Sequence, residues 1–313
     1  QNGLRMQVYI KSVVEDTVNE PELPIIDAHH HLWDLHACHY PWLMARDEKR
    51  FFGDPAPIQR NYLPGDFLAE SRRYVPVKSV HIQVGVAPED EVNETAWLQE
   101  QTPCPSAIVA ATDLSSPDVE LQLQRHQAFS KLRGVRQIIG RHAEEDKRHN
   151  SDTLLGNPGF VDGLRLLQSK GLSFDLQMIP PQMQRVIAVL EQVPELPVAL
   201  CHAGSPWDQS QPGLAAWRRG LKNLAGLPNV VCKISGLGMF KPDWEVEDLR
   251  PIVLDVIDIF SPQRVMLGSN FPVDKLYRSY DALWDAYAQI TSGLTRAERQ
   301  CLYYDTAAQF YRI

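Results

Sequence analysis

The chain has 313 residues, enough for one large domain or two small ones. Hydrophobic residues make up 44% and charged residues 22%, which is ordinary for a globular protein, and the formal net charge of −8 disfavours nucleic acid and anionic membranes as partners. No apolar run approaches the roughly 20 residues that span a bilayer.

Two further features bear on the compartment. The five cysteines are scattered and include no C-x-x-C pair, which is typical of free thiols in a reducing compartment, so we expect a cytoplasmic protein. Residues 1–23 lack the apolar core of a secretory signal. We expect them to form an extension, in part vector-derived or disordered, ahead of one domain over residues 24–313.

Short apolar segments alternate with longer amphipathic ones along this domain. Most of the short segments are rich in valine and isoleucine and too short for helices, which is typical of buried parallel strands. The predicted strands cover 25–29, 77–84, 106–112, 132–138, 172–178, 197–202, 229–235 and 264–270.

The clearest helical patterns lie between the later strands, and they cover 159–171, 181–193, 214–226 and 246–260. The first ends on Gly171, as expected of a helix C-cap. The last contains Pro251, which we expect near its first turn.

This alternation favours a single (β/α)8 TIM barrel, because about eight strand–helix units fit the chain length. The alternative is a doubly wound open sheet. No G-x-G-x-x-G follows the first strand, which disfavours the dinucleotide-binding form of that fold. The long segment 40–64 after the first strand is typical of a lid or a substrate wall.

Polar side chains stand near the C-terminal ends of most predicted strands, where a TIM barrel carries its active site. A single one could be a structural group, but each unpaired buried polar group costs about 1–3 kcal/mol, so the whole set indicates a site. The set is His29, His30, His31, His81, Gln83, Arg133, Arg136, Asp175, Gln177, His202, Lys233, Ser235 and Asn270.

The histidines of the first strand carry the strongest signal. His29 and His31 are two residues apart on an extended chain, so they point to one side, whereas His30 points away and is expected to pack. His202 could add a third nitrogen from across the barrel. Imidazole is both a common metal ligand and a general acid or base near pH 7, so both roles stay open.

At this point the sequence resembles the amidohydrolase superfamily, in particular its amidohydrolase-2 branch of TIM-barrel lactone hydrolases. That branch includes fuconolactonase-like, sulfomuconolactone and pyrone-dicarboxylate hydrolases. The motifs, in order, are IIDAHHHLWDL (25–35), VHIQVG (80–85), LRGVRQ (132–137), LCHAGSP (200–206), NVVCKISGL (229–237) and RVMLGSNFPVD (264–274). The resemblance implies a hydrolase that opens a lactone of a sugar acid or of an aromatic-degradation intermediate, with water attacking the carbonyl at the C-terminal mouth of the barrel.

The resemblance also implies residue roles. His29 and His31 match the family's first-strand H-x-H motif, His202 its sixth-strand histidine, and Arg136 an arginine that holds an anionic or oxygen-rich substrate. The three histidines are expected to act either without a metal or around one zinc-like divalent cation. We expect a small anionic or polyhydroxylated substrate, and a homodimer is one option for the assembly. Further expected substrate contacts are Lys233, His81, Gln83, Gln177, Trp33 and Trp207.

Two departures from the family pattern bear on the mechanism. Gln177 or Met178 stands where metal-dependent members carry a histidine, and Asn270 stands where the family carries an aspartate that activates water. An amide cannot take a proton near neutral pH, and Asp274 is the nearest acid in sequence. The general base is therefore Asp274, a metal-bound hydroxide or one of the histidines.

Two other functions stay open at this stage. One is a non-oxidative, metal-dependent decarboxylase. The other is a ligand-binding pseudoenzyme that lost its base at Asn270.

Overall fold

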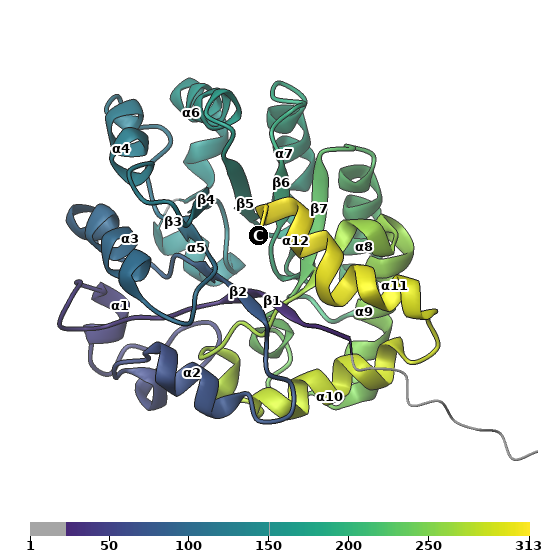
Figure 1. The fold of residues 1–313 in the computed structure, drawn as a ribbon. Coiled ribbons are helices and arrows are strands. Elements are labelled where there is room, and N and C mark those ends of the chain that lie inside the picture. Colours follow the sequence, from purple (N-terminus) through teal and green to yellow (C-terminus); the bar gives the residue numbers. More distant parts are fainter. Residues whose placement is uncertain (1–22, 150) are drawn as a thin grey trace, which may run out of the picture.

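The computed structural model describes residues 23–149 and 151–313, and its strands form one eight-stranded sheet in the order β1 to β8 (Figure 1). Each consecutive pair of strands is parallel. The strands are β1 (Ile26–His30), β2 (Lys78–Ile82), β3 (Ala107–Ala110), β4 (Leu132–Ile138), β5 (Ser173–Gln177), β6 (Val198–Leu200), β7 (Val230–Ile234) and β8 (Val265–Leu267).

Backbone hydrogen bonds also join the end of β1 to the segment after β8. The amide of Asn270 donates to the carbonyl of His29, and the amide of His31 donates to the carbonyl of Phe271, both at 2.7 Å. The sheet therefore closes into the predicted TIM barrel, and the doubly wound open sheet is not formed. Of the predicted extension 1–23, only Leu23 lies within the described residues.

The strands match the predicted apolar segments because a parallel barrel buries both faces of each strand. All residues of β3 (AIVA), β6 (VAL) and β8 (VML) are buried. The helices between the strands form an outer ring in Figure 1. In the part of the chain that the structure describes, no helix combines the length and apolar character needed to cross a membrane.

Twelve α-helices are described within residues 23–149 and 151–313. They are α1 (Pro41–Met44), α2 (Pro64–Glu70), α3 (Glu91–Glu100), α4 (Val119–His126), α5 (Ala143–His149), α6 (Pro158–Ser169), α7 (Met183–Leu190), α8 (Gln211–Ala225), α9 (Val246–Phe260), α10 (Tyr280–Thr291), α11 (Arg296–Gln300) and α12 (Thr306–Tyr311).

The four helices predicted from sequence correspond to α6 to α9. Gly171 follows α6 with a φ of +66°, a left-handed conformation that favours glycine. Pro251 lies in the second turn of α9 and not near the first, which corrects the prediction. The helix begins at Val246, as predicted, and the backbone amide of Glu245 just before it donates to the Asp248 carboxylate at 2.8 Å.

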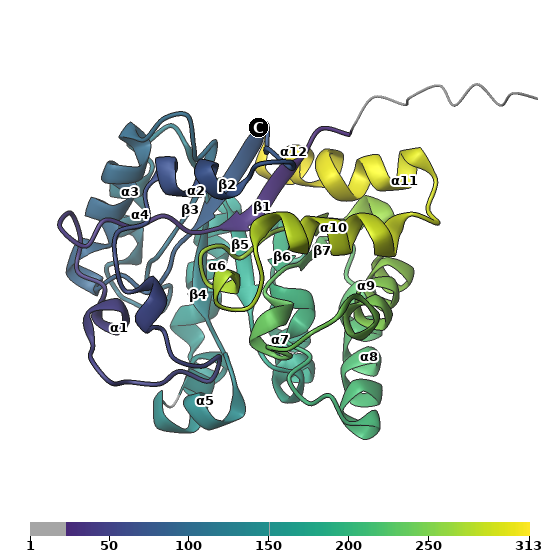
Figure 2. The same ribbon diagram turned by 90° about the horizontal axis from the view of Figure 1, so that it is seen from below.

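The two ends of the barrel are built differently. Tyr311 of α12 packs with apolar strand residues that include Ile26, Val80, Val109 and Met266. In Figure 2, α11 and α12 lie at one end, whereas α1 and α5, which follow β1 and β4, lie at the other. The C-terminal helix therefore covers one end, and the loops after the strands surround the opposite end.

Candidate functional site

A cavity of about 390 Å³ lies among the loops that follow the strands. The ends of β1, β5, β6 and β8 contribute His31, Gln177, His202 and Asn270. The long segment after β1 forms a wall, as predicted from its length. That wall includes Trp42, Glu48, Arg50, Phe51 and Phe52, and β4 with its following loop adds Arg136, Ile138 and Arg141.

The three predicted histidines lie next to one another, and His31 and His202 line this cavity, whereas His29 is not among the lining residues. The ring centroids of His29 and His202 are 4.6 Å apart, and those of His29 and His31 are 5.2 Å apart. All three side chains are buried. Neither ring nitrogen of His29 has a hydrogen-bond partner among the described residues, so this imidazole is free to meet a substrate or a cation.

The neighbours of His202 leave one of its nitrogens for the cavity. Its Nδ1 lies 3.0 Å from Ser235 Oγ and 3.3 Å from the Ser235 carbonyl oxygen. Nε2 is therefore the nitrogen that can reach a ligand. His202 and Asn270 also have positive φ angles of 54° and 57°, and such strained backbone is common at functional sites.

Burial keeps the three imidazoles uncharged. Burial, together with the charge of Arg136, lowers the pKa of His31 to about 3. Burial also places the pKa values of His29 and His202 well below the ordinary value, with Lys233 the next cause at His29 and Arg136 at His202. Neutral imidazoles can accept a proton or bind a metal ion.

His30 lies apart from this cluster. Its ring stacks on Phe67 of α2 at 4.2 Å between centroids, and its Nε2 lies 2.9 Å from Ser79 Oγ. The prediction that His30 packs away from the site is confirmed.

A chain of polar contacts leads from the cavity to Asp274. His31 Nε2 lies 3.1 Å from Asn270 Oδ1, and Asn270 Nδ2 donates to the Asp274 carboxylate at 2.6 Å. Asp274 is buried and does not line the cavity. Burial raises its pKa to about 7, although the hydrogen bonds from Asn270 and from the Gly238 amide oppose this rise. Asp274 thus reaches the cavity only through Asn270.

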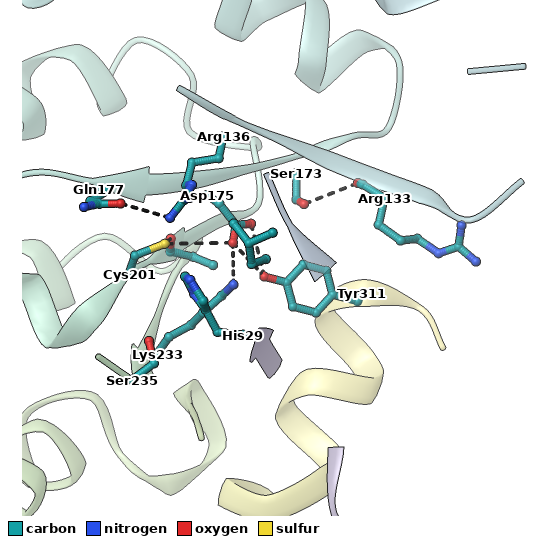
Figure 3. A network of polar contacts seen from close by, with 12 residues as sticks. His29, Arg133, Arg136, Ser173, Asp175, Gln177, Cys201, Lys233, Ser235 and Tyr311 are labelled. Atoms are coloured by element: carbon teal, nitrogen blue, oxygen red, sulfur yellow. Dashed lines mark hydrogen bonds and ion pairs between the residues drawn. The ribbon is translucent and has the colours of Figure 1, made fainter. Parts of the chain in front are cut away.

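Arg136 is held by uncharged groups. Its guanidinium donates to Gln177 Oε1 at 2.9 Å (Figure 3). It also donates to the carbonyl oxygen of Gln83, while its Nε has no partner among the described residues. The side chain is only 4% exposed, yet it lines the cavity. Gln177 also lines the cavity, whereas Gln83 is not among its lining residues and supports Arg136 from behind.

The structure does not bring Lys233 to the cavity. Its ammonium group is fully buried and donates to the Asp175 carboxylate, which also accepts from the Tyr311 hydroxyl at 2.9 Å (Figure 3). Asp175 and the surrounding core enclose the charge, so the geometry gives no support to the predicted substrate contact of Lys233.

Three other predicted substrate contacts, His81, Trp33 and Trp207, also lie outside the cavity lining. His81 Nδ1 accepts from the Leu32 amide at 3.0 Å, and Trp33 Nε1 donates to the Arg60 carbonyl at 2.6 Å. Trp207 lines a separate hollow of about 170 Å³. These predicted contacts are therefore not supported by the geometry.

Sequence reasoning missed several lining residues. Arg50, Phe51, Phe52 and Arg141 lie in irregular segments, where no strand-end pattern marks them. Arg50 forms a bidentate pair with Glu145 at 2.9 and 3.0 Å. The unusual length of segment 40–64 was the signal that a wall was present, but it did not indicate which residues form it.

The site fits one cation in part. His29 and His202 have ring nitrogens free to hold it, and a bound divalent ion would polarise a carbonyl and lower the pKa of its water to about 7. His31 could join only by leaving Asn270. Among the described residues, no ready-made group of three or more His, Cys, Asp or Glu side chains could hold a metal.

Comparison with known proteins identifies the family of this chain. The amidohydrolase family model matches residues 26–313. The chain belongs to the amidohydrolase family. The resemblance drawn from its motifs is confirmed.

Individual relatives cover nearly the whole of this amidohydrolase. Protein y4mH of Sinorhizobium fredii, which is uncharacterized, is 40% identical over 296 residues, covering 93% of this chain and 99% of that protein. The L-fucono-1,5-lactonase of Burkholderia multivorans is 33% identical over 306 residues, covering 92% and 96%. A crystal structure of a B. multivorans amidohydrolase with bound zinc is 30% identical, with a TM-score of 0.77 and coverage of 93% and 99%.

Proposed function

We propose that this amidohydrolase opens a lactone, a cyclic ester, by adding water to its carbonyl carbon. The observation that carries the proposal is the cluster of neutral imidazoles, His29, His31 and His202, of which His31 and His202 line the same cavity as the buried guanidinium of Arg136. The relative named L-fucono-1,5-lactonase supports a cyclic ester as the bond that is broken.

Ester opening requires a group that takes a proton from water and a group that stabilises the oxyanion. The unpartnered nitrogen of His29, or Nε2 of His202, can accept the proton as the water oxygen bonds to the carbonyl carbon. The ring C–O bond then breaks, and the proton passes to the leaving alkoxide. The products are one carboxylic acid and one hydroxyl group on the same molecule.

Asn270 and Asp274 have supporting parts in this proposal. Asn270 cannot accept the proton, and Asp274 does not line the cavity. The Asp274 carboxylate holds the Asn270 amide so that its oxygen faces His31. A bound cation, as in the zinc-containing structure of the B. multivorans relative, would add to the polarisation of the carbonyl.

The test is a pH-indicator assay over a panel of sugar-acid lactones, because each ring opening releases a proton. We expect opening above the spontaneous rate, and a loss of about 100-fold or more in His29→Ala and His202→Ala, as for general acid–base groups. Binding without turnover across the panel would favour a pseudoenzyme. Release of carbon dioxide from an aromatic carboxylic acid, without lactone opening, would favour a decarboxylase.

A further inference from the structure

A tight turn in the middle of the wall segment reaches the cavity. The backbone amide of Arg50 donates to the Gly53 carbonyl at 2.9 Å, and the amide of Gly53 donates back to the Arg50 carbonyl at 3.0 Å. Residues 50–52 line the cavity, whereas the side chains of residues 46–49, just before them, are exposed. We call residues 50–53 the wall turn.

The wall turn extends across the mouth of the barrel. It belongs to the segment after β1, but it contacts segments that follow β4, β7 and β8. The ring centroid of Phe51 lies 5.3 Å from that of His142 and 6.2 Å from that of Phe240, and the Tyr277 hydroxyl donates to the Phe52 carbonyl at 2.6 Å. Because β4 lies three strands from β1 in an eight-stranded barrel, a segment that joins their loops crosses the opening.

Glu145 of α5 holds the wall turn at two consecutive residues. Its buried carboxylate accepts from the Arg50 guanidinium at 2.9 and 3.0 Å and from the Phe51 backbone amide at 3.0 Å. Charge-assisted bidentate bonds of this kind are stronger than bonds between neutral groups. The same guanidinium lies over the rings of Trp42 and Phe52, at 5.3 and 5.4 Å from their centroids. One carboxylate therefore fixes both the charged and the aromatic part of the turn.

We propose that the wall turn is a lid over the cavity and that Glu145 is its latch, a positioning residue that holds the lid closed and releases it for substrate entry and product release. Loops that close over an active site exclude water and complete its walls, and they move by changes in a few backbone angles. Residues 46–49 can absorb such a change because their side chains are exposed. The inference goes beyond the proposed lactone hydrolysis, and only its kinetic tests rest on that reaction.

Hydrogen–deuterium exchange tests the latch without any substrate. Glu145→Gln keeps the volume of the side chain but removes its charge and one acceptor oxygen. We expect the amides of residues 50–53 to exchange about 10-fold faster in this variant, while those of β7 keep their rate. The control is Glu247→Gln, which removes the bidentate partner of Arg250 on α9, outside the cavity lining. Unchanged exchange at 50–53 in Glu145→Gln, or an equal increase in β7, would contradict the latch.

The reaction rate of a thiol inside the cavity measures entry directly. Met239 is buried and lines the cavity, so Met239→Cys places a thiol there. Of the native cysteines only Cys301 is not buried, and Cys301→Ser is therefore included in every protein. We expect a thiosulfonate reagent to modify the new cysteine about 10-fold faster when Glu145→Gln is added, and at an unchanged rate when Glu247→Gln is added. Equal rates in all three proteins would overturn the proposal.

A removable cross-link tests whether the lid has to open during turnover. Phe51→Cys and His142→Cys place two thiols where the two rings stack, and a bis-thiosulfonate reagent joins them until a reductant is added. We expect the joined protein to open lactones at about one tenth or less of the rate of the same protein after reduction. Equal rates before and after reduction, with the cross-link verified by mass spectrometry, would contradict a lid that opens in each cycle.

Failure of the lid and failure of the proposed function give different results. If no lactone is opened, lactone hydrolysis fails, while amide exchange and thiol reaction in Glu145→Gln still decide the role of the latch. If lactones are opened, Glu145→Gln should raise KM about 10-fold and change kcat less than about 3-fold, because the imidazoles keep their positions. A loss of kcat as large as that in His202→Ala would assign Glu145 to the chemical step and contradict the latch.

Discussion

The side-chain amide of Asn270 donates a hydrogen bond of 2.6 Å to the buried carboxylate of Asp274. The same amide faces His31 Nε2 with its oxygen at 3.1 Å. Asp274 therefore orients Asn270 and, through it, His31. We therefore expect Asp274 to act as a positioning residue, although it is the nearest acid in sequence to the position of the family's aspartate.

Replacement of Asp274 tests this role. Asp274→Asn removes the anionic acceptor but keeps the volume of the side chain, so we expect kcat to fall by about 10-fold, the size typical of lost outer support for a site. The measurement is the rate of lactone opening over pH. A loss of more than about 1000-fold, partly restored by the additional change Asn270→Asp, would identify Asp274 as the base and contradict the positioning role.

His29 and His30 are adjacent but should respond differently to alanine. His30→Ala removes the stack on Phe67 and the bond to Ser79, so the free energy of unfolding should fall by about 2–3 kcal/mol while kcat/KM changes little. His29→Ala should keep most of the stability and lose about 100-fold or more in turnover. Urea unfolding measures the stability of the two variants, and lactone kinetics on the same preparations measure their turnover. Equal kinetic losses would mean that the assignment of the two faces of the strand is wrong.

The stability of the fold should fall on acidification below about pH 6.5. Burial lowers the pKa of His30 to about 3 from an ordinary value of 6.5, so the unfolded chain binds a proton at this position that the folded chain does not. The stabilisation is present above the unfolded pKa and is lost as the pH falls, by about 1.4 kcal/mol per pH unit. In urea unfolding between pH 6.5 and 4, His30→Gln should show a shallower slope than the wild type. If the dependence of the unfolding free energy on pH is unchanged in His30→Gln, His30 does not contribute to the loss of stability in acid.

The Lys233–Asp175 pair should be structural. Lys233→Met leaves the Asp175 carboxylate buried without its cation, so the free energy of unfolding should fall by about 3–5 kcal/mol. The double variant Lys233→Met, Asp175→Leu should regain part of that loss, because it removes both charges from the core. Thermal and urea unfolding of the three proteins provide the measurement. A stable Lys233→Met protein with strongly weakened substrate binding would indicate that Lys233 contacts the substrate and would contradict the structural role.

The fold could be read from the sequence because its signals are local. Valine- and isoleucine-rich runs such as 230–234 form strands wherever both faces are covered, and the H-x-H spacing brings the rings of His29 and His31 close together. Position at a strand end did not show whether a polar atom was free. Lys233 is bound to Asp175 from another strand, and that pairing depends on the barrel's tertiary packing.

The arginine missed from sequence illustrates the opposite difficulty. Arg141 follows β4 in an irregular segment, where no periodicity distinguishes a cavity residue from a surface one. Its place in the cavity wall becomes evident only in the structure, where Asp146 binds its backbone amide and Glu145 binds Arg50. Hydrogen-bond and ion-pair partners of this kind depend on tertiary packing and cannot be predicted from the local sequence.

The most direct test of the proposed lactone hydrolysis is the initial rate of ring opening of a panel of sugar-acid lactones by wild type, His29→Ala and His202→Ala, recorded by proton release at constant enzyme concentration. The account predicts catalysed opening by the wild type and a rate reduced by about 100-fold or more in each histidine variant, with thermal unfolding showing that both variants are folded. Wild-type rates equal to spontaneous opening, or variants as active as the wild type, would contradict it.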